Sequence, residues 1–221
     1  MGSVMRATRP AGELTARLFP RNGYYTKGLP AGTPLRARLR TLWLELELRA
    51  RLFVKGAVRG LQGTGVIGVC RLHATVFRGD GRIEHLGLLS TRVITDAGVA
   101  YLVDDWDGGG NVIDNFNYHG VGTGTNAENA SDTGLQTEST TALNPDSTRA
   151  TGTKSQPAAN QARTVGTVTF DAGAAITEHG IFTQAATGGG TLWDRSVFSA
   201  INVVSGDSIQ FTHTTTYSSG G

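Results

Sequence analysis

The sequence predicts a mainly β protein: an antiparallel β-sandwich, immunoglobulin-like or jelly-roll-like, with an extended N-terminal arm and one or two short helices. The 31 glycines, with Thr and Ser in the second half, are typical of many short strands joined by tight turns. Ile209, Phe211 and His213 alternate with polar residues, which is the period of a strand. Asp80-Gly81 lies between two apolar runs and is a strong hairpin signal. We expect a basic arm and amphipathic segment over 1–60 and a sandwich body over 61–221.

Residues 1–34 are predicted to be an extended arm, because four prolines alternate with glycines along them. Arms of this composition often gain structure only against a partner. Charged residues and prolines interrupt the first 20 residues, so nothing there resembles a signal peptide.

Residues 35–59 fit two patterns. Apolar and charged residues alternate from Leu44 to Leu52, as in a strand, but leucines from Leu35 to Leu46 also follow a helical stripe. Glu45–Arg49 and Glu47–Arg51 are ion pairs at helical spacing, and one β-branched residue, Thr41, lies between Leu35 and Phe53. The segment is predicted to be a helix that ends at Gly56 or Gly60. The eight charged residues between positions 35 and 58 exclude a membrane span.

The rest of the chain is predicted to contain a hairpin over 66–93, a short helix over 96–106 and Gly/Thr-rich strands over 112–217. Thr95 or Asp96 would cap the helix, with Val99, Leu102 and Val103 on one face. Residues 123–147 form a long polar loop, which is either functional or ordered by a neighbour. The predicted strands are Asn115–Gly122, Arg149–Lys154, Arg163–Asp171, Ala175–Thr183, Gly190–Ala200 and Asp207–Tyr217.

Candidate chemical residues are present but not in recognisable patterns. None of the five histidines has a second ligand at zinc spacing on a shared element, since Glu178 and His179 point to opposite faces of a strand. We expect His119 and His179 to pack beside the glycines that follow them and to donate to neighbouring carbonyls. The single cysteine, Cys70, lies in an apolar run and is expected to be a core residue.

Other motifs favour structural explanations. The glycines of 120–125 lack the Lys-Ser/Thr of a phosphate-binding loop. The loop carboxylates match no calcium-binding pattern and are predicted to form a solvated acidic surface: Glu128, Asp132, Glu138 and Asp146. No paired acid and base or nucleophile motif is present, so the sequence predicts no catalytic residues, no cofactor, no metal and no enzyme activity.

Charge is divided unequally along the chain. Residues 1–92 hold 16 basic and 5 acidic residues, a net charge of +11, whereas residues 93–221 hold 4 basic and 13 acidic ones, a net charge of −9. Such asymmetry is typical of a protein whose basic part meets an oppositely charged surface. Direct nucleic-acid binding is not expected, because no aromatic ladder accompanies the arginines. The predicted partner-binding residues are Arg36, Arg38, Arg40, Arg49 and Arg51.

The second half resembles a family of known proteins. The ordered motifs are Tyr118–Thr125, Asp132–Glu138, Thr148–Gly152, Arg163–Thr167, Ile176–Phe182 and Leu192–Phe198. Over about residues 93–221 they are similar to tailed-bacteriophage virion structural proteins, variously described as capsid decoration, or cement, proteins and tail-fibre-like proteins. The resemblance brings no catalytic residues with it.

The resemblance implies a capsid cement protein on the virion surface, assembled in the host cytoplasm. Its partners would be the major capsid protein and copies of itself, as a trimer or other symmetric cluster, with no membrane. The alternative is a tail or tail-fibre component that takes part in host attachment, and a wall-degrading enzyme ranks last.

Overall fold

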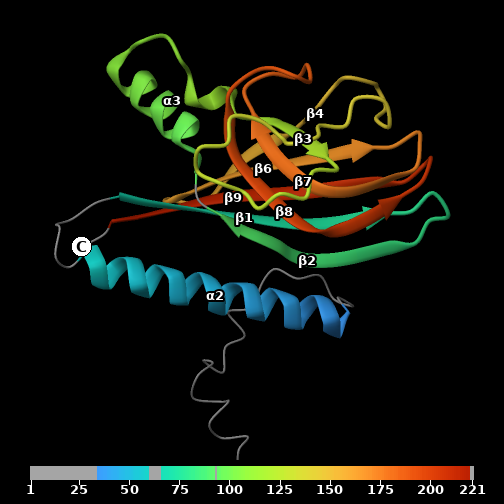
Figure 1. Ribbon diagram of the computed structural model, residues 1–221, viewed down its shortest axis with the longest axis horizontal. Helices are drawn as coiled ribbons and strands as arrows, with labels where there is room; N and C mark the ends of the chain where they lie inside the picture. Colours follow the sequence, from blue (N-terminus) through green and yellow to red (C-terminus); the bar gives the residue numbers. More distant parts are fainter. Residues whose placement is uncertain (1–33, 60–65, 93, 220–221) are drawn as a thin grey trace, which may run out of the picture.

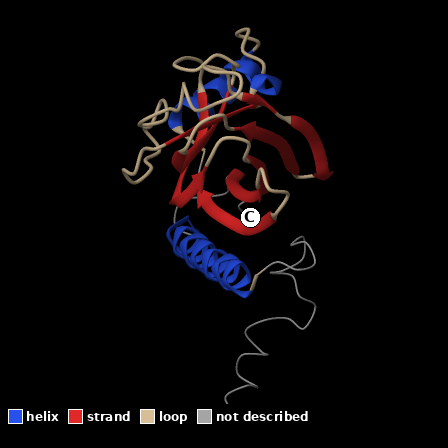
Figure 2. Ribbon diagram, turned by 90° about the vertical axis from the view of Figure 1, so that its right-hand side faces the viewer, coloured by secondary structure: helices blue, strands red, loops and turns tan. Residues whose placement is uncertain are grey.

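A computed structural model describes residues 34–59, 66–92 and 94–219, with side chains except those of residues 48–59 and 92. Apart from Pro34, the predicted arm lies outside the described residues. The described chain is an antiparallel β-sandwich (Figures 1 and 2), which confirms the predicted fold class.

Over the described ranges, nine strands form two sheets. The five-stranded sheet has the order β2-β1-β9-β6-β5 and the four-stranded sheet the order β4-β3-β7-β8. The strands are β1 Val66–Phe77, β2 Ile83–Arg92, β3 Tyr118–Gly122, β4 Ala150–Thr151, β5 Thr153–Ala158, β6 Gln161–Thr169, β7 Ala174–Phe182, β8 Leu192–Val203 and β9 Ser208–Ser219.

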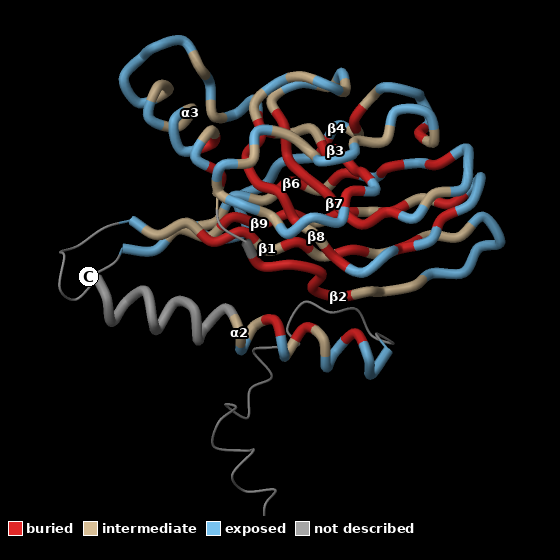
Figure 3. The backbone as a smooth tube through the Cα atoms, viewed as in Figure 1, coloured by how far each residue is buried: buried red, intermediate tan, exposed pale blue. Residues whose placement is uncertain are grey.

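The core lies between the sheets, where period-two alternation brings apolar side chains from both sides together. On β9, Ile209, Phe211 and His213 share one face of the strand, as the alternation predicted, and they are buried. The principal core cluster takes side chains from both sheets: Leu72, Ala74, Val76, Leu89, Val121, Leu143, Val168, Phe170, Ile176, Phe198, Ile201, Val203, Ile209 and Phe211. Figure 3 shows this buried band running through the middle of the strands.

The predicted strand over 149–154 is divided in two. Residues 150–151 form β4 in one sheet, and the chain then crosses at Gly152 to begin β5 in the other. A Cβ on Gly152 would overlap the Thr164 hydroxyl, so glycine permits this close crossing. The predicted strand over 115–122 begins only at Tyr118, because Ile113–Asn115 form a short 3₁₀ turn, η1.

The segment 35–59 is a helix, α2 Leu35–Arg59, so the helical prediction is confirmed. It lies along β2, on the outer side of the five-stranded sheet (Figures 1 and 2). Thr41 joins the two elements: its hydroxyl donates to the Ala37 carbonyl at 2.9 Å and accepts the Leu88 N–H at 3.0 Å. Beside it, Arg71 of β1 donates to Glu45 at 2.9 Å.

The short helix is α3 Asp96–Asp107, close to the predicted 96–106. Thr95 is its N-cap and accepts the Gly98 N–H at 3.0 Å. Gly108, with a φ of 76°, ends it in the left-handed conformation. Of its predicted apolar face, Leu102 packs inward while Val99 and Val103 are exposed.

Candidate assembly surfaces and buried polar clusters

The outward face of α2 carries a stripe of exposed apolar side chains, which we call the α2 stripe: Leu35, Leu39, Trp43 and Leu46. Leu35 is 71% exposed and Trp43 63%. Spacings of four, four and three residues place the stripe on one face of the helix. The opposite face, with Ala37, Thr41 and Leu44, is buried against the sheet.

The predicted partner-binding arginines that the structure describes flank the α2 stripe. Helical periodicity places Arg36 and Arg40 on one side of it and Arg38 on the other. Arg36 and Arg38 are exposed, whereas Arg40 is half-buried and its burial lowers the pKa of the guanidinium. The side chains of Arg49 and Arg51 lie outside the described residues. The surface is therefore apolar along its centre, with arginines at its edges.

A second exposed stripe lies on α3, which we call the α3 stripe: Val99, Val103 and Trp106. Trp106 is 90% exposed. Asp96 and Asp107 are exposed and adjoin this stripe on the helix, so its charge is opposite to that of the α2 stripe. The two helices lie on opposite sides of the sandwich (Figures 1 and 2).

The long loop 123–147 is ordered by the strands beneath it. Glu178 of β7 is completely buried, and its carboxylate accepts the N–H groups of Gly124, Gln136 and Thr137 at 2.8–3.0 Å. Arg195 of β8 donates to the same carboxylate at 2.8 Å. This confirms that a neighbouring element orders the loop.

Two of the four loop carboxylates are paired with buried arginines, so the prediction of a solvated acidic surface was wrong for them. Asp132 accepts from Arg195 at 3.1 Å. Glu138 accepts two hydrogen bonds from Arg149, whose guanidinium lies 3.5 Å from the Phe182 ring centroid. Nη1 of that guanidinium donates to two backbone carbonyls, which helps to compensate for burial of the charge.

His119 and His179 bond each other rather than carbonyl groups, so that prediction was wrong. Their ring nitrogens lie 3.0 Å apart, and the other nitrogen of His119 is 3.1 Å from the Thr164 hydroxyl. Burial lowers the pKa of His119 to about 3 and that of His179 well below its ordinary value. Both rings are therefore neutral at neutral pH.

A further polar cluster surrounds Cys70, which is buried as predicted. His213 and Asp194 approach within 3.1 Å, and Thr215 lies 3.4 Å from the Cys70 sulfur. Burial opposes protonation of His213, but the Asp194 carboxylate, together with the Cys70 sulfur, raises its pKa to about 10. Sequence spacing could not reveal this cluster, because its members come from β1, β8 and β9. The only sequence signal was the charged pair Asp194-Arg195 inside an apolar strand.

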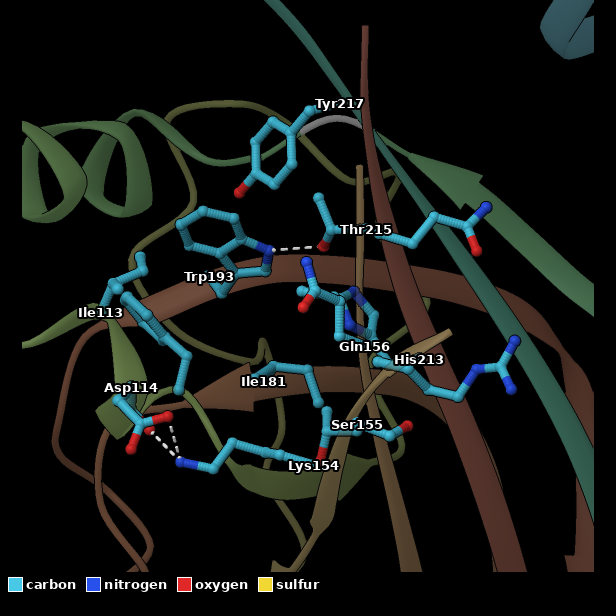
Figure 4. A pocket seen from close by; sticks show the side chains of 15 residues that line it. Ile113, Asp114, Lys154, Ser155, Gln156, Ile181, Trp193, His213, Thr215 and Tyr217 are labelled. Atoms are coloured by element: carbon cyan, nitrogen blue, oxygen red, sulfur yellow. Dashed lines mark hydrogen bonds and ion pairs between the residues drawn. The ribbon is translucent and has the colours of Figure 1, made fainter. Parts of the chain in front are cut away.

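A pocket of about 400 Å³ opens beside this cluster. His213, Thr215 and Trp193 line it, Tyr217 lies on one side, and the ion pair of Lys154 with Asp114 lies on the other (Figure 4). The rest of the lining is Ile113, Phe116, Ser155, Gln156, Gln161, Ala162, Arg163, Thr164 and Ile181. The pocket has the size and mixed lining of a small-ligand site.

Comparison with known proteins gives no match, either among family models or among curated proteins and solved structures. Among the described residues, no helix is long and apolar enough to cross a membrane.

Proposed function

We propose that this protein is a bacteriophage virion structural protein, a capsid cement protein that attaches to the icosahedral head and to copies of itself. The observation that carries the proposal is the two-sided helix α2. One of its faces docks on the protein's own sheet, and the other exposes Leu39, Trp43 and their neighbours. Exposed apolar patches rimmed by polar residues mark protein interfaces.

The α2 stripe has enough apolar surface for attachment when many copies act together. Complete burial of a large apolar side chain is worth about 1.5–3 kcal/mol, and association must offset lost translational and side-chain freedom. One stripe of four side chains would give a weak contact in isolation. On a symmetric shell, contacts repeated between linked copies raise the effective concentration and produce tight attachment.

The α3 stripe supplies a complementary surface for self-contact. The α3 stripe is flanked by the acidic residues Asp96 and Asp107, whereas the α2 stripe is flanked by the basic residues Arg36 and Arg40. Because the two helices lie on opposite sides of the body, α2 of one copy would meet α3 of the next in a head-to-tail contact (Figure 1). Such contacts form rings when the rotation between copies closes, in keeping with a trimer or other symmetric cluster.

The test is binding of the purified protein to empty shells of the phage that encodes it. We expect the double variant Leu39→Glu/Trp43→Glu to lower affinity at least tenfold, because it places charge in the apolar stripe. Val204→Glu is the matched control, since Val204 is 62% exposed and belongs to neither stripe. Unchanged occupancy by the double variant, or by a chain without residues 1–60, would contradict attachment through α2.

Salt dependence distinguishes the ionic part of the self-contact from its apolar part. Pairing of arginines with acidic groups is screened as ionic strength rises, whereas apolar burial is not. We expect self-association, measured by sedimentation, to weaken at high salt and on Val103→Glu. An association that resists salt would assign the contact to the leucines and Trp43 alone.

The pocket beside His213 favours a second candidate, a tail component that takes part in host attachment. Its mixed aromatic and polar lining suits a small receptor group. Copy number in purified virions distinguishes the candidates, since a cement protein covers the head in many copies and a tail protein occurs in few. Inhibition of host adsorption by the free protein would favour the tail.

A further inference from the structure

Three side chains of metal-ligating type meet at one point between the sheets. Cys70 comes from β1, His213 from β9 and Asp194 from β8, and one potential ligand atom of each lies within 4.8 Å of the others. Cys70 and His213 face the same side of the five-stranded sheet, because Cys70 pairs with Thr215, two residues beyond His213. Asp194 reaches them from the four-stranded sheet.

All three side chains are shielded from solvent. Asp194 is 0% exposed, Cys70 1% and His213 3%. A buried carboxylate is costly unless strong partners compensate for its lost hydration. Among the described side chains, the polar contacts of the Asp194 carboxylate are His213 at 3.1 Å and the Ser196 hydroxyl at 3.4 Å.

The alignment of His213 with Asp194 is poor for a hydrogen bond. The carboxylate oxygen Oδ1 and the ring nitrogen Nε2 are close, yet among the described residues neither has a hydrogen-bond partner of acceptable geometry. Two buried polar atoms that are near each other but not aimed at each other fit a shared third partner better than a simple ion pair.

We propose that Cys70, Asp194 and His213 bind one zinc ion, with the fourth coordination position turned toward the pocket. Thiolate, imidazole and carboxylate are the three ligand types that zinc takes in proteins. Zinc–ligand bonds of about 2.0–2.3 Å at tetrahedral angles place the ligand atoms roughly 3.3–3.7 Å apart. Asp194 and His213 are 3.1 Å apart and all three potential ligand atoms lie within 4.8 Å of one another, so small side-chain adjustments suffice.

The surroundings supply the outer contacts and the entry path that a metal site needs. The Thr215 hydroxyl lies 3.4 Å from the Cys70 sulfur and accepts the Trp193 indole N–H at 3.1 Å, while Ser196 donates to Asp194. The pocket that His213 and Thr215 line gives access from solvent (Figure 4). A bound ion would join the two sheets, so binding would also stabilise the fold.

Cobalt substitution tests the site. Untagged protein is stripped of metal under reducing conditions and titrated with Co²⁺, and zinc content is measured separately on protein dialysed against zinc. We expect about one equivalent of either metal, with visible absorption of tetrahedral cobalt and a thiolate-to-cobalt charge-transfer band. Cys70 is the only cysteine, so that band can come from no other side chain of the protein.

Variants assign the ligands. Cys70→Ser should abolish the charge-transfer band and lower zinc content at least tenfold, and Asp194→Asn should weaken cobalt binding at least tenfold. His119→Gln is the matched control: it alters another buried histidine and should leave the cobalt spectrum unchanged. Circular dichroism establishes that each variant is folded.

The titration of the unaltered protein is decisive even if a variant fails to fold. Absence of a thiolate–cobalt band from the folded protein would overturn the proposal. So would a folded Cys70→Ser protein that keeps its full zinc content, or equal loss of binding in His119→Gln.

Discussion

Replacing Glu178 with Gln should detach the long loop from the sandwich and destabilise the protein severely. The change keeps the shape of the side chain and removes its charge. Glu178 is 0% exposed and accepts three backbone N–H groups and the Arg195 guanidinium. A glutamine has one oxygen for these donors, and its amide group would face at least one of them. Among the described residues, the buried Arg195 would keep only Asp132 as a charged partner.

The magnitude follows from these contacts. Breaking a buried ion pair by removing one member costs about 3–5 kcal/mol. For a chain of this length, each kcal/mol lowers Tm by about 2–4 °C, so we expect a fall of roughly 6–20 °C. Thermal unfolding followed by circular dichroism measures the fall. Hydrogen exchange should show that the amides of Gly124, Gln136 and Thr137 lose protection.

The matched control is Asp80→Asn, which breaks the exposed ion pair between Asp80 and Arg82 in the hairpin turn. Solvent screens that pair, so its loss should change Tm little. The reasoning is refuted if Glu178→Gln lowers Tm no more than Asp80→Asn does, or if the loop amides stay protected.

Three further changes probe other contacts. Thr41→Val removes the acceptor of the Leu88 N–H and should lower the free energy of unfolding, measured in urea, by about 1–3 kcal/mol. Thr167→Val, at an exposed position of β6, should lower it less. Equal losses of stability would contradict a role for the Thr41 hydroxyl. Gly122→Ala would press a Cβ against the Thr137 carbonyl and should cost about 1–3 kcal/mol in the same assay, but Gly134→Ala, with open space around it, should be nearly neutral. Because burial lowers the folded-state pKa of His119 to about 3, the unfolded chain binds more protons below pH 6.5, and stability must fall as pH falls from there toward 3. The free energy of unfolding, measured in urea between pH 7 and 5, should therefore fall less steeply for His119→Gln than for the unaltered protein. An unchanged slope would show that His119 does not titrate in this way.

The fold was largely predictable because its signals are local. Alternation along β9 identified the side chains that share a face, Asp80-Gly81 identified the hairpin turn, and Thr95 was one of the two residues predicted to cap the short helix. In α2 the competing strand pattern over 44–52 was wrong, since helix-forming residues dominate the segment. Sequence could not say which face of α2 would meet the body. The structure buries the narrow face with Ala37, Thr41 and Leu44 and exposes most of the leucine stripe.

The polar clusters were not predictable, because they depend on which strands become neighbours. Glu178 and His179 do point to opposite faces of β7, as expected, but their partners come from distant parts of the chain. The same holds for Asp194 and His213, which lie on different sheets. Spacing within one element cannot report contacts of this kind.

The position of β9 determines when the body can be completed during synthesis. β9, the last of the described strands, lies between β1 and β6 at the centre of the five-stranded sheet. One of the two neighbours of β1 is therefore synthesised about 140 residues after it. Until β9 leaves the ribosome, β1 and β6 each present an unpaired edge, and such edges favour aggregation. A chain truncated just before Ser208 would therefore keep the strands of the smaller sheet but lack the centre of the larger one, which makes it a substrate for chaperones and proteases rather than for assembly.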